Sequence, residues 1–299
     1  MGVGDVTTVE TCTDLHYVDT GMYDTAGYGA VYIVDADRPA VVDTGIGTNV
    51  DRVLAALDTV GIAPTDLAAI AVTHVHLDHA GGAGFLADAC PNATVYVHEI
   101  GAPHLADPTR LVEGTRRAVG DQWQYYTEPE PVPEDRIVAL TDGDTVDLGD
   151  RRLAAHHVPG HAPHQVAYHD SLDDAVFTAD AAGIWVPALG RVVETSPPPN
   201  FEFEQCLEDV DTIRGLDPDH LLYPHFGPAP RTALEDYPDV LRKWVDEVAA
   251  ALDTHGDPET TLDAIDVDPG RERVWGAFKA RAETRMNAEG VIHYLQHRD

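Results

Sequence analysis

Lysine is almost absent from this chain. Only Lys243 and Lys279 occur among 299 residues, and Lys and Arg together number 19 against 52 Asp and Glu, a formal net charge of −33. Because contacts to a nucleic-acid backbone need clustered Lys and Arg, this shortage excludes nucleic acid as an expected partner. The acids are spread along the chain, which predicts an acidic, halophilic surface whose self-repulsion is screened by salt.

Cysteine and long apolar runs are also scarce. Cys12, Cys90 and Cys206 lie far apart and follow no metal-ligand spacing, so neither a disulfide framework nor a thiolate site is expected. No apolar run is long enough to span a bilayer, and the start of the chain lacks a basic segment before an apolar stretch. We therefore expect a cytoplasmic protein without a membrane partner.

Potential metal ligands are concentrated in one short segment. His74, His76, Asp78 and His79 lie within six residues, directly after the apolar run 67–72. On an extended backbone, His74 and His76 project to the same face. A histidine-rich surface loop without chemistry is the alternative, but four donors in so short a segment favour a metal site at the end of a strand.

A turn is expected directly after this segment. Gly81, Gly82 and Gly84 would supply the backbone freedom that a tight turn needs, and a helix is predicted to start near Phe85.

Three further candidate ligands each follow a strand-like stretch. His161 follows 152–158, Asp180 follows 174–179, and His225 follows 220–224. Taken singly, each has an ordinary alternative: a loop histidine, a helix cap and a turn histidine. Only their conjunction with the first segment favours a shared site.

Together these residues resemble the metallo-β-lactamase superfamily of metallohydrolases, and its glyoxalase II-like branch in particular. The match covers about residues 15 to 230, with the segment His74-Xaa-His76-Xaa-Asp78-His79 as its signature. The resemblance implies two divalent metal ions, one held by three histidines, one held by an aspartate and two histidines, and both bridged by an aspartate: His74, His76 and His161; Asp78, His79 and His225; and Asp180. It places Asp43 and His164 beside the ligands as supporting residues.

The resemblance further implies a hydrolase that uses a metal-bridging hydroxide. The expected small-molecule substrate is a thioester or carboxylic ester, with Asp78 orienting the hydroxide and moving its proton. Nitrogen and oxygen donors without thiolate suit zinc, and also iron or manganese.

Other functions stay open at this point. A persulfide dioxygenase of the same superfamily would hold one iron at positions matching His74, His161 and Asp180. A lactonase is less favoured, because Gly183 stands where those enzymes often carry tyrosine. The segment 181–183 also departs from the Gly-Cys-Gly-Arg of glyoxalase II. A non-catalytic binding module is the third class.

The expected fold is a mixed α/β structure, a four-layer αβ/βα sandwich with a small C-terminal helical unit. This follows from the resemblance and agrees with strand-like runs at 29–34, 39–43, 68–73 and 94–98 around a helical stretch at 49–60. We expect a catalytic domain over residues 1–230 and a helical domain over residues 231–299. The oligomeric state is open, with a homodimer as one alternative.

Two irregular regions could border the site: the insertion 102–133 and the loop 191–203. His98 and His104 are placed in the helical insertion after the strand 94–97 and are expected at the surface, with a place in the wall of a substrate pocket as the alternative. His156, His157 and His169 are expected in strands or at the surface.

Overall fold

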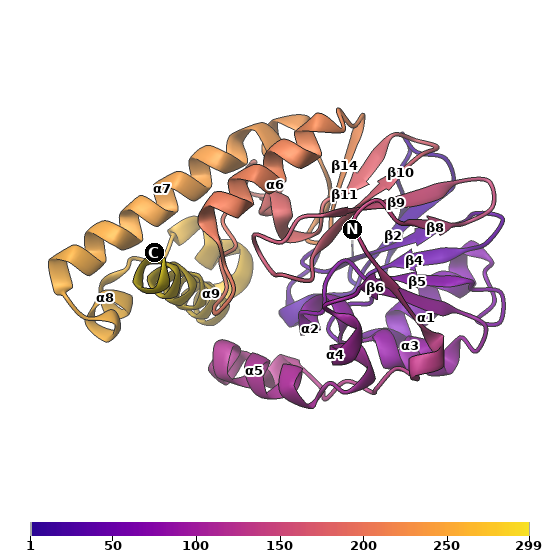
Figure 1. The fold of residues 1–299 in the computed structure, drawn as a ribbon, viewed down its shortest axis with the longest axis horizontal. Coiled ribbons are helices and arrows are strands. Elements are labelled where there is room, and N and C mark those ends of the chain that lie inside the picture. Colours follow the sequence, from indigo (N-terminus) through magenta and orange to yellow (C-terminus); the bar gives the residue numbers. More distant parts are fainter. Residues whose placement is uncertain (1, 299) are drawn as a thin grey trace.

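The computed structural model describes residues 2–298, which form two β-sheets packed face to face with helices outside (Figure 1). The apolar layer between the sheets combines Tyr32 and Val42 of the first sheet with Leu153 and Phe177 of the second. The rings of Tyr32 and Phe177 meet edge to face at 5.2 Å. The Tyr32 hydroxyl donates a hydrogen bond to the carbonyl oxygen of Tyr223 at 2.7 Å, which ties the two sheets together.

The first sheet has seven strands in sequence order. Pairing is antiparallel from β1 to β4 and parallel from β4 to β7. The strands are β1 (Val6–Thr8), β2 (Leu15–Asp19), β3 (Ala30–Val34), β4 (Ala40–Val42), β5 (Ala69–Ala71), β6 (Thr94–His98) and β7 (Ile137–Leu140).

The second sheet has six strands in the order β15-β14-β11-β10-β9-β8, and β12 and β13 form a separate hairpin. Its pairs are antiparallel except β11 with β14. The strands are β8 (Thr145–Asp147), β9 (Arg152–His157), β10 (Val166–Asp170), β11 (Ala175–Phe177), β12 (Ile184–Val186), β13 (Arg191–Val193), β14 (His220–Tyr223) and β15 (Gly227–Ala229).

Helices cover the outer face of each sheet, which completes the predicted four layers. Apolar residues of α1 and α3 pack on the first sheet, and those of α6 and α7 pack on the second. The helices are α1 (Val50–Val60), α2 (Leu77–Ala80), α3 (Ala83–Ala89), α4 (Ala102–Ala106), α5 (Thr109–Val119), α6 (Phe203–Gly215), α7 (Arg231–His255), α8 (Pro258–Ala264) and α9 (Pro269–His297). Short 3-10 helices are η1 (Met22–Asp24), η2 (Gly120–Tyr125), η3 (Glu134–Arg136) and η4 (Ala179–Ala182).

The C-terminal unit of α7, α8 and α9 is helical, as predicted, and it shares a core with the second sheet. Leu241 and Val248 of α7 lie in the same apolar cluster as Val176 and Leu221 of the sheet. The domain boundary at residue 230 therefore stays a prediction. In Figure 1, α9 faces α5 of the insertion, and the two helices are in contact.

The helix predicted to start near Phe85 is α3, which starts at Ala83. The segment before it was expected as a tight turn and instead forms the short helix α2 from Leu77. Gly81 and Gly82 have negative φ and need no special freedom. They permit close approach instead, because a Cβ on Gly82 would lie 2.5 Å from the carbonyl oxygen of Thr44.

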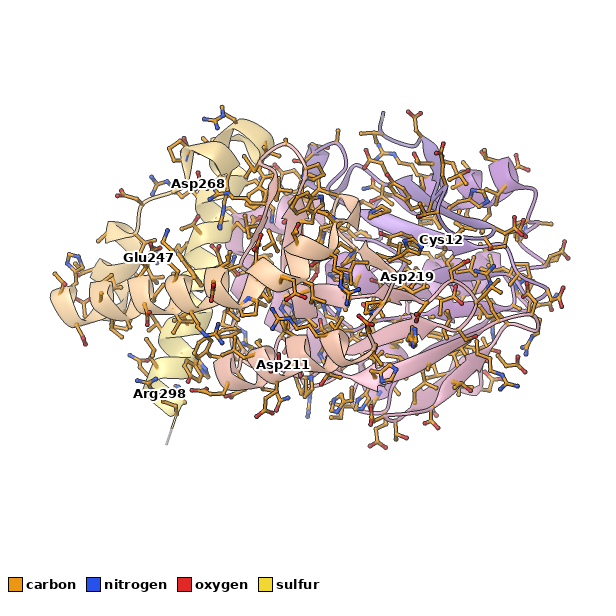
Figure 2. The ribbon with its side chains drawn as sticks, turned by 90° about the horizontal axis from the view of Figure 1, so that it is seen from above. Cys12, Asp211, Asp219, Glu247, Asp268 and Arg298 are labelled. Atoms are coloured by element: carbon orange, nitrogen blue, oxygen red, sulfur yellow. The ribbon has the colours of Figure 1, made fainter. Side chains whose placement is uncertain are left out.

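Several properties predicted from composition can be located in the structure. Cys12, Cys90 and Cys206 are free and buried. The acidic side chains Asp211 and Glu247 are exposed on α6 and α7 (Figure 2). Within residues 2–298, every helix is too short or too polar to cross a membrane.

Candidate metal centre

The seven predicted ligands come from loops and short helices that follow strands of both sheets. His74 and His76 follow β5, and α2 carries the next two donors directly after them. The others follow β9, β11 and β14 in the second sheet. Strand ends of both sheets thus deliver one group of side chains: His74, His76, Asp78, His79, His161, Asp180 and His225.

Asp180 lies among the histidines. Its Oδ2 is 3.4 Å from His161 Nε2, 3.5 Å from His79 Nε2 and 4.0 Å from His74 Nε2. Its Oδ1 is 3.4 Å from His225 Nε2. One carboxylate therefore reaches histidines contributed by both sheets.

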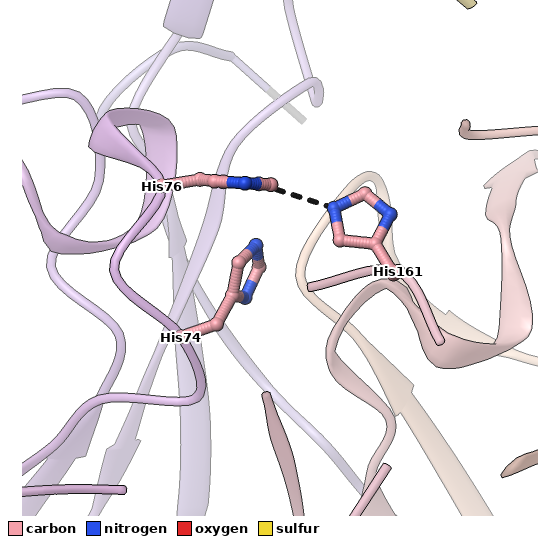
Figure 3. A group of neighbouring side chains, drawn as sticks. All are labelled: His74, His76 and His161. Atoms are coloured by element: carbon pink, nitrogen blue, oxygen red, sulfur yellow. Dashed lines mark hydrogen bonds between the residues drawn. The ribbon is translucent and has the colours of Figure 1, made fainter. Parts of the chain in front are cut away.

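The side chains fall into overlapping groups whose donor atoms all lie within 4.8 Å of one another: His74, His76 and His161; His74, His79 and Asp180; and Asp78, His79 and His225. Figure 3 shows the first group, in which His76 Nδ1 and His161 Nε2 are 3.1 Å apart. The rings of His79 and His225 have centroids 5.1 Å apart, so predicted ligands that are distant in the sequence also meet.

Several donor atoms in this group have no hydrogen-bond partner among the described residues. Nε2 of His74, Nε2 of His79 and Oδ1 of Asp180 are buried and unsatisfied. Buried polar atoms are nearly always paired, because leaving one unpaired is costly. Lone pairs aimed into a shared space, from nitrogen and oxygen donors, fit divalent metal ions.

A second layer of contacts fixes the histidine rings. His79 Nδ1 is 3.0 Å from Asp43 Oδ2, and His225 Nδ1 is 3.0 Å from the carbonyl oxygen of Tyr28. His74 Nδ1 contacts the Thr73 hydroxyl, which itself donates to Asp43. Each contact can be made by a proton on Nδ1, and in that neutral tautomer the Nε2 lone pair is available to a metal.

Backbone strain gathers around the same residues. Asp43 has φ of 61°, Ala179 next to Asp180 has 49°, and Phe226 next to His225 has 64°. Residues other than glycine rarely adopt this left-handed region, and its cost is tolerated mostly at functional sites.

Burial and charge set the ionisation of the ligands. Burial, followed by the charges of His79 and His76, lowers the pKa of His74 well below its usual value. Burial lowers the pKa of His161 to about 3. Burial alone would raise the pKa of Asp180, but His79 and His225 lower it well below its usual range. Neutral imidazoles around an ionised carboxylate are the forms that bind metals.

His79 differs from His74 and His161 in its protonation. Burial would lower its pKa, but the charges of Asp180 and Asp78 raise the pKa well above the usual value. Metal binding at His79 therefore displaces a proton.

The His164 ring lies 6.2 Å from that of His74 and 5.6 Å from that of His76, centroid to centroid. The backbone N–H of Val75 donates to its Nδ1 at 3.3 Å. Burial, followed by the charges of His76 and His104, lowers its pKa to about 2. The ring therefore stays neutral and is buried against the segment that carries His74 and His76.

The prediction for His98 is wrong. It was expected at the surface but is 3% exposed in β6. The rings of His98 and His157 stack with their centroids 4.1 Å apart, and this contact stabilises the buried His98 ring. His104 is half-buried and lines the cavity described next, whereas His156, His157 and His169 lie in strands, as expected.

Five of the seven donors line a cavity of about 540 Å³: His76, Asp78, His161, Asp180 and His225. The insertion and the loop 195–200 form much of its wall, so both irregular regions border the site. α9 contributes Lys279 and Glu283, which form a buried ion pair.

Sequence reasoning missed Tyr23 and Tyr126. Tyr23 is buried, its hydroxyl lies 2.5 Å from that of Tyr126, and it donates to Asp78 Oδ2 at 3.4 Å. Lys279 Nζ lies 3.8 Å from the centre of the Tyr23 ring. The sequence offered one indirect signal. The chain has only two lysines, and one of them, Lys279, lies in this cavity next to Tyr23.

The comparisons with known proteins agree with this geometry. The sequence profile of the Metallo-beta-lactamase superfamily matches residues 24–225. The Metallo-beta-lactamase fold-containing protein ST1585 of Sulfurisphaera tokodaii is 26% identical over 231 residues, which cover 76% of this chain and 83% of that protein. The crystal structure of ST1585, aligned at 23% identity, covers 94% of this chain and 99% of that one with a TM-score of 0.72.

Two enzymes are similar over a shorter span. Acyl-coenzyme A thioesterase MBLAC2 of Bos taurus is 26% identical over 56% of this chain and 62% of its own length. The hydroxyacylglutathione hydrolase of Bdellovibrio bacteriovorus is 30% identical over 53% of this chain and 48% of its own length. Since the profile spans every donor from His74 to His225, the chain belongs to the metallo-beta-lactamase superfamily.

Proposed function

We propose that this protein is a binuclear metallohydrolase that acts on a thioester or a related carboxylic ester. The observation that carries the proposal is that Asp180, in the wall of the cavity, lies 3.4 Å from His161 of one ligand group and 3.4 Å from His225 of the other. His74, His76 and His161 would hold one divalent ion, and Asp78, His79 and His225 the other, with Asp180 shared between them. The donors suit zinc, and also iron or manganese.

When bound, such ions act as Lewis acids and lower the pKa of water enough to supply a nucleophile at neutral pH. Residues of the chain would handle the proton, position the ligands and orient the substrate. Asp78 lines the cavity and can hold a proton during the reaction, while the Tyr23 hydroxyl at 3.4 Å restricts its carboxylate. Asp43 fixes His79, and the walls of the cavity orient the substrate.

The thioester is favoured by the names of two relatives, an acyl-coenzyme A thioesterase and a hydroxyacylglutathione hydrolase. The lactonases that carry tyrosine at the position of Gly183 are a poor match for this chain, because the structure leaves no room for a side chain there. Gly183 has φ of 76°, and a Cβ there would lie 2.4 Å from the Tyr237 ring. No side chain fits without rearrangement.

Hydrolysis of a panel of substrates tests the proposal. Protein loaded with zinc, manganese or iron should cleave an acyl-coenzyme A or S-acylglutathione. Asp180→Asn should lower kcat by more than about a hundredfold, which exceeds the loss expected when a residue that only supports a ligand is changed. Asp170→Asn is the matched control, because this buried carboxylate contacts Arg151 at 3.0 Å in a separate network. Failure of every metal form to cleave any ester or thioester would refute the proposal.

A second candidate is an iron-dependent persulfide dioxygenase. His74 and His161 both approach Asp180 Oδ2, at 4.0 and 3.4 Å, and these three side chains could hold a single iron. Iron as the bound metal, together with oxygen uptake on a thiol persulfide, would favour this function over hydrolysis.

A further inference from the structure

Helix α5 of the insertion turns one side toward the cavity. Arg110, Gly114 and Arg117 lie four and three residues apart, a spacing that aligns them along one helix face. All three line the cavity, together with Leu111 and Ala118. No residue of α5 is fully buried, so this face remains accessible to a ligand.

In the part of the chain that the structure describes, the two cavity-facing arginines have no close ion pair. The charge of Arg110 acts on Asp107, and Arg117 Nε donates to the carbonyl oxygen of Glu113 at 3.3 Å. Among residues 2–298, neither Arg110 nor Arg117 has a carboxylate in ion-pair contact. Arg116 on the same helix differs, because it pairs with Glu128 at 2.5 Å, lies 4.5 Å from the Trp123 ring centre and is not part of the cavity wall. Lys279, the other cation in the cavity wall, forms an ion pair with Glu283.

Arg110 and Arg117 place positive charge on the cavity wall without a close ion pair among the described residues to neutralise it. With a net charge of −33, the protein as a whole repels anions, so an anionic substrate needs a local positive site. Guanidinium groups bind phosphate and carboxylate through two parallel hydrogen bonds. Gly114 leaves room between the two arginines, because a Cβ there would meet no atom within 4 Å.

Another part of the wall is mostly apolar. Leu77, Ile184, Met286 and the prolines 197–199 line the same cavity and are apolar or weakly polar. An apolar acyl group suits this part of the wall, and an oxyanion suits the α5 face.

We infer that Arg110 and Arg117 form an anion-binding subsite that holds the phosphate- or carboxylate-bearing thiol of a thioester substrate. This inference rests on the proposed function for the bond that is cleaved: water adds its hydroxyl to the acyl carbon, the C–S bond breaks, and a proton goes to the departing thiolate. The arginines bind the thiol portion before and after cleavage alike, so they affect binding more than the chemical step.

Binding of the free thiols tests the subsite without any turnover. Isothermal titration calorimetry of the metal-loaded protein should detect coenzyme A or glutathione, with phosphate and carboxylate as the respective anions, but only weak binding of uncharged N-acetylcysteamine. The double variant Arg110→Gln/Arg117→Gln should bind the anionic thiol about tenfold more weakly. Arg116→Gln should leave binding unchanged.

Hydrolysis supplies an independent measurement. The double variant should raise KM about tenfold for the preferred anionic thioester and leave kcat unchanged, because an equal loss in ground and transition states appears in KM. Its KM for an S-acyl-N-acetylcysteamine should stay at the wild-type value.

The outcomes separate the two proposals. If neither coenzyme A nor glutathione binds, or if the double variant binds them as tightly as wild type, the subsite is refuted. If an anionic thiol binds through the arginines but no thioester is cleaved, the subsite stands and the proposed function fails.

Discussion

At the scale of single residues, Asp43 links two ligands. It accepts a hydrogen bond from the Thr73 hydroxyl, which contacts His74, and it lies 3.0 Å from His79 Nδ1. Asp43→Asn should weaken metal affinity by about ten- to a hundredfold, because an amide cannot accept both contacts and leaves His79 less basic. Asparagine tolerates the φ of 61°, so the backbone is retained.

Competition with a chelator measures this affinity. Asp170→Asn removes an equally buried carboxylate from the Arg151 network and should lower stability without changing metal affinity. Equal metal affinity of Asp43→Asn and wild type would show that Asp43 does not support the centre.

Asp209 should make the free energy of unfolding depend on pH. It is 1% exposed and accepts a hydrogen bond from the backbone N–H of Gly160 at 2.6 Å. Burial, against its hydrogen bonds from Gln205 and Gly160, raises its pKa to about 6 from 3.8. The folded state therefore holds the proton more tightly, and this contribution is fully present below about pH 4 and lost as pH rises through about 6.

The melting midpoints of wild type and Asp209→Asn should therefore differ by an amount that changes with pH. Wild type should gain stability relative to the variant as pH falls from about 7 to 4. The exposed Asp211→Asn on the same helix serves as the control. A constant difference between wild type and Asp209→Asn across this range would contradict the assignment.

Local spacing made much of the centre predictable at this scale. His74, His76, Asp78 and His79 are adjacent in sequence, so their pattern alone indicates a site. Tyr23 reaches Asp78 only through the tertiary fold, and no local pattern marks it. His98 was misplaced because its ring is buried by stacking on a residue of another sheet.

At the scale of elements, the glycines after α2 act through close packing. A Cβ on Gly84 would lie 2.0 Å from the carbonyl oxygen of Glu130, a backbone atom that cannot easily move. Gly84→Ala should lower the free energy of unfolding by about 1–3 kcal/mol, as overpacking usually does.

Gly215→Ala at the end of α6 is the matched change, because a Cβ there meets nothing within 4 Å. It should be neutral or stabilising by up to about 1 kcal/mol. Denaturant unfolding compares the two variants, and equal stabilities would argue against the packing role of Gly84.

Element positions followed from sequence better than element ends. The alternation of strands and helices fits the sandwich, but α7 begins at Arg231 and continues through Pro238, a residue type that usually ends a helix. Tyr237 and Pro238 are both buried, so packing overrides the tendency of proline to end a helix. Such long-range packing has no local sequence signal.

At the scale of the whole molecule, charge should govern stability. With 52 acidic and 19 basic residues, repulsion between carboxylates opposes folding at low salt. Raising KCl from about 0.1 M to multimolar concentration shortens the Debye length from about 10 Å to below 3 Å and should raise the melting midpoint. Circular dichroism measures it, and an unchanged midpoint would refute the halophilic prediction.

The metal content of the whole protein tests the central claim most directly. Purified protein, loaded with zinc and freed of loosely bound ions, should contain two ions per chain by elemental mass spectrometry, because Asp180 lies 3.4 Å from His161 of one proposed ligand group and 3.4 Å from His225 of the other. His225→Ala should retain one ion, since it leaves His74, His76 and His161 intact. Wild-type protein that holds no tightly bound ion, or a variant that still holds two, would contradict the binuclear centre.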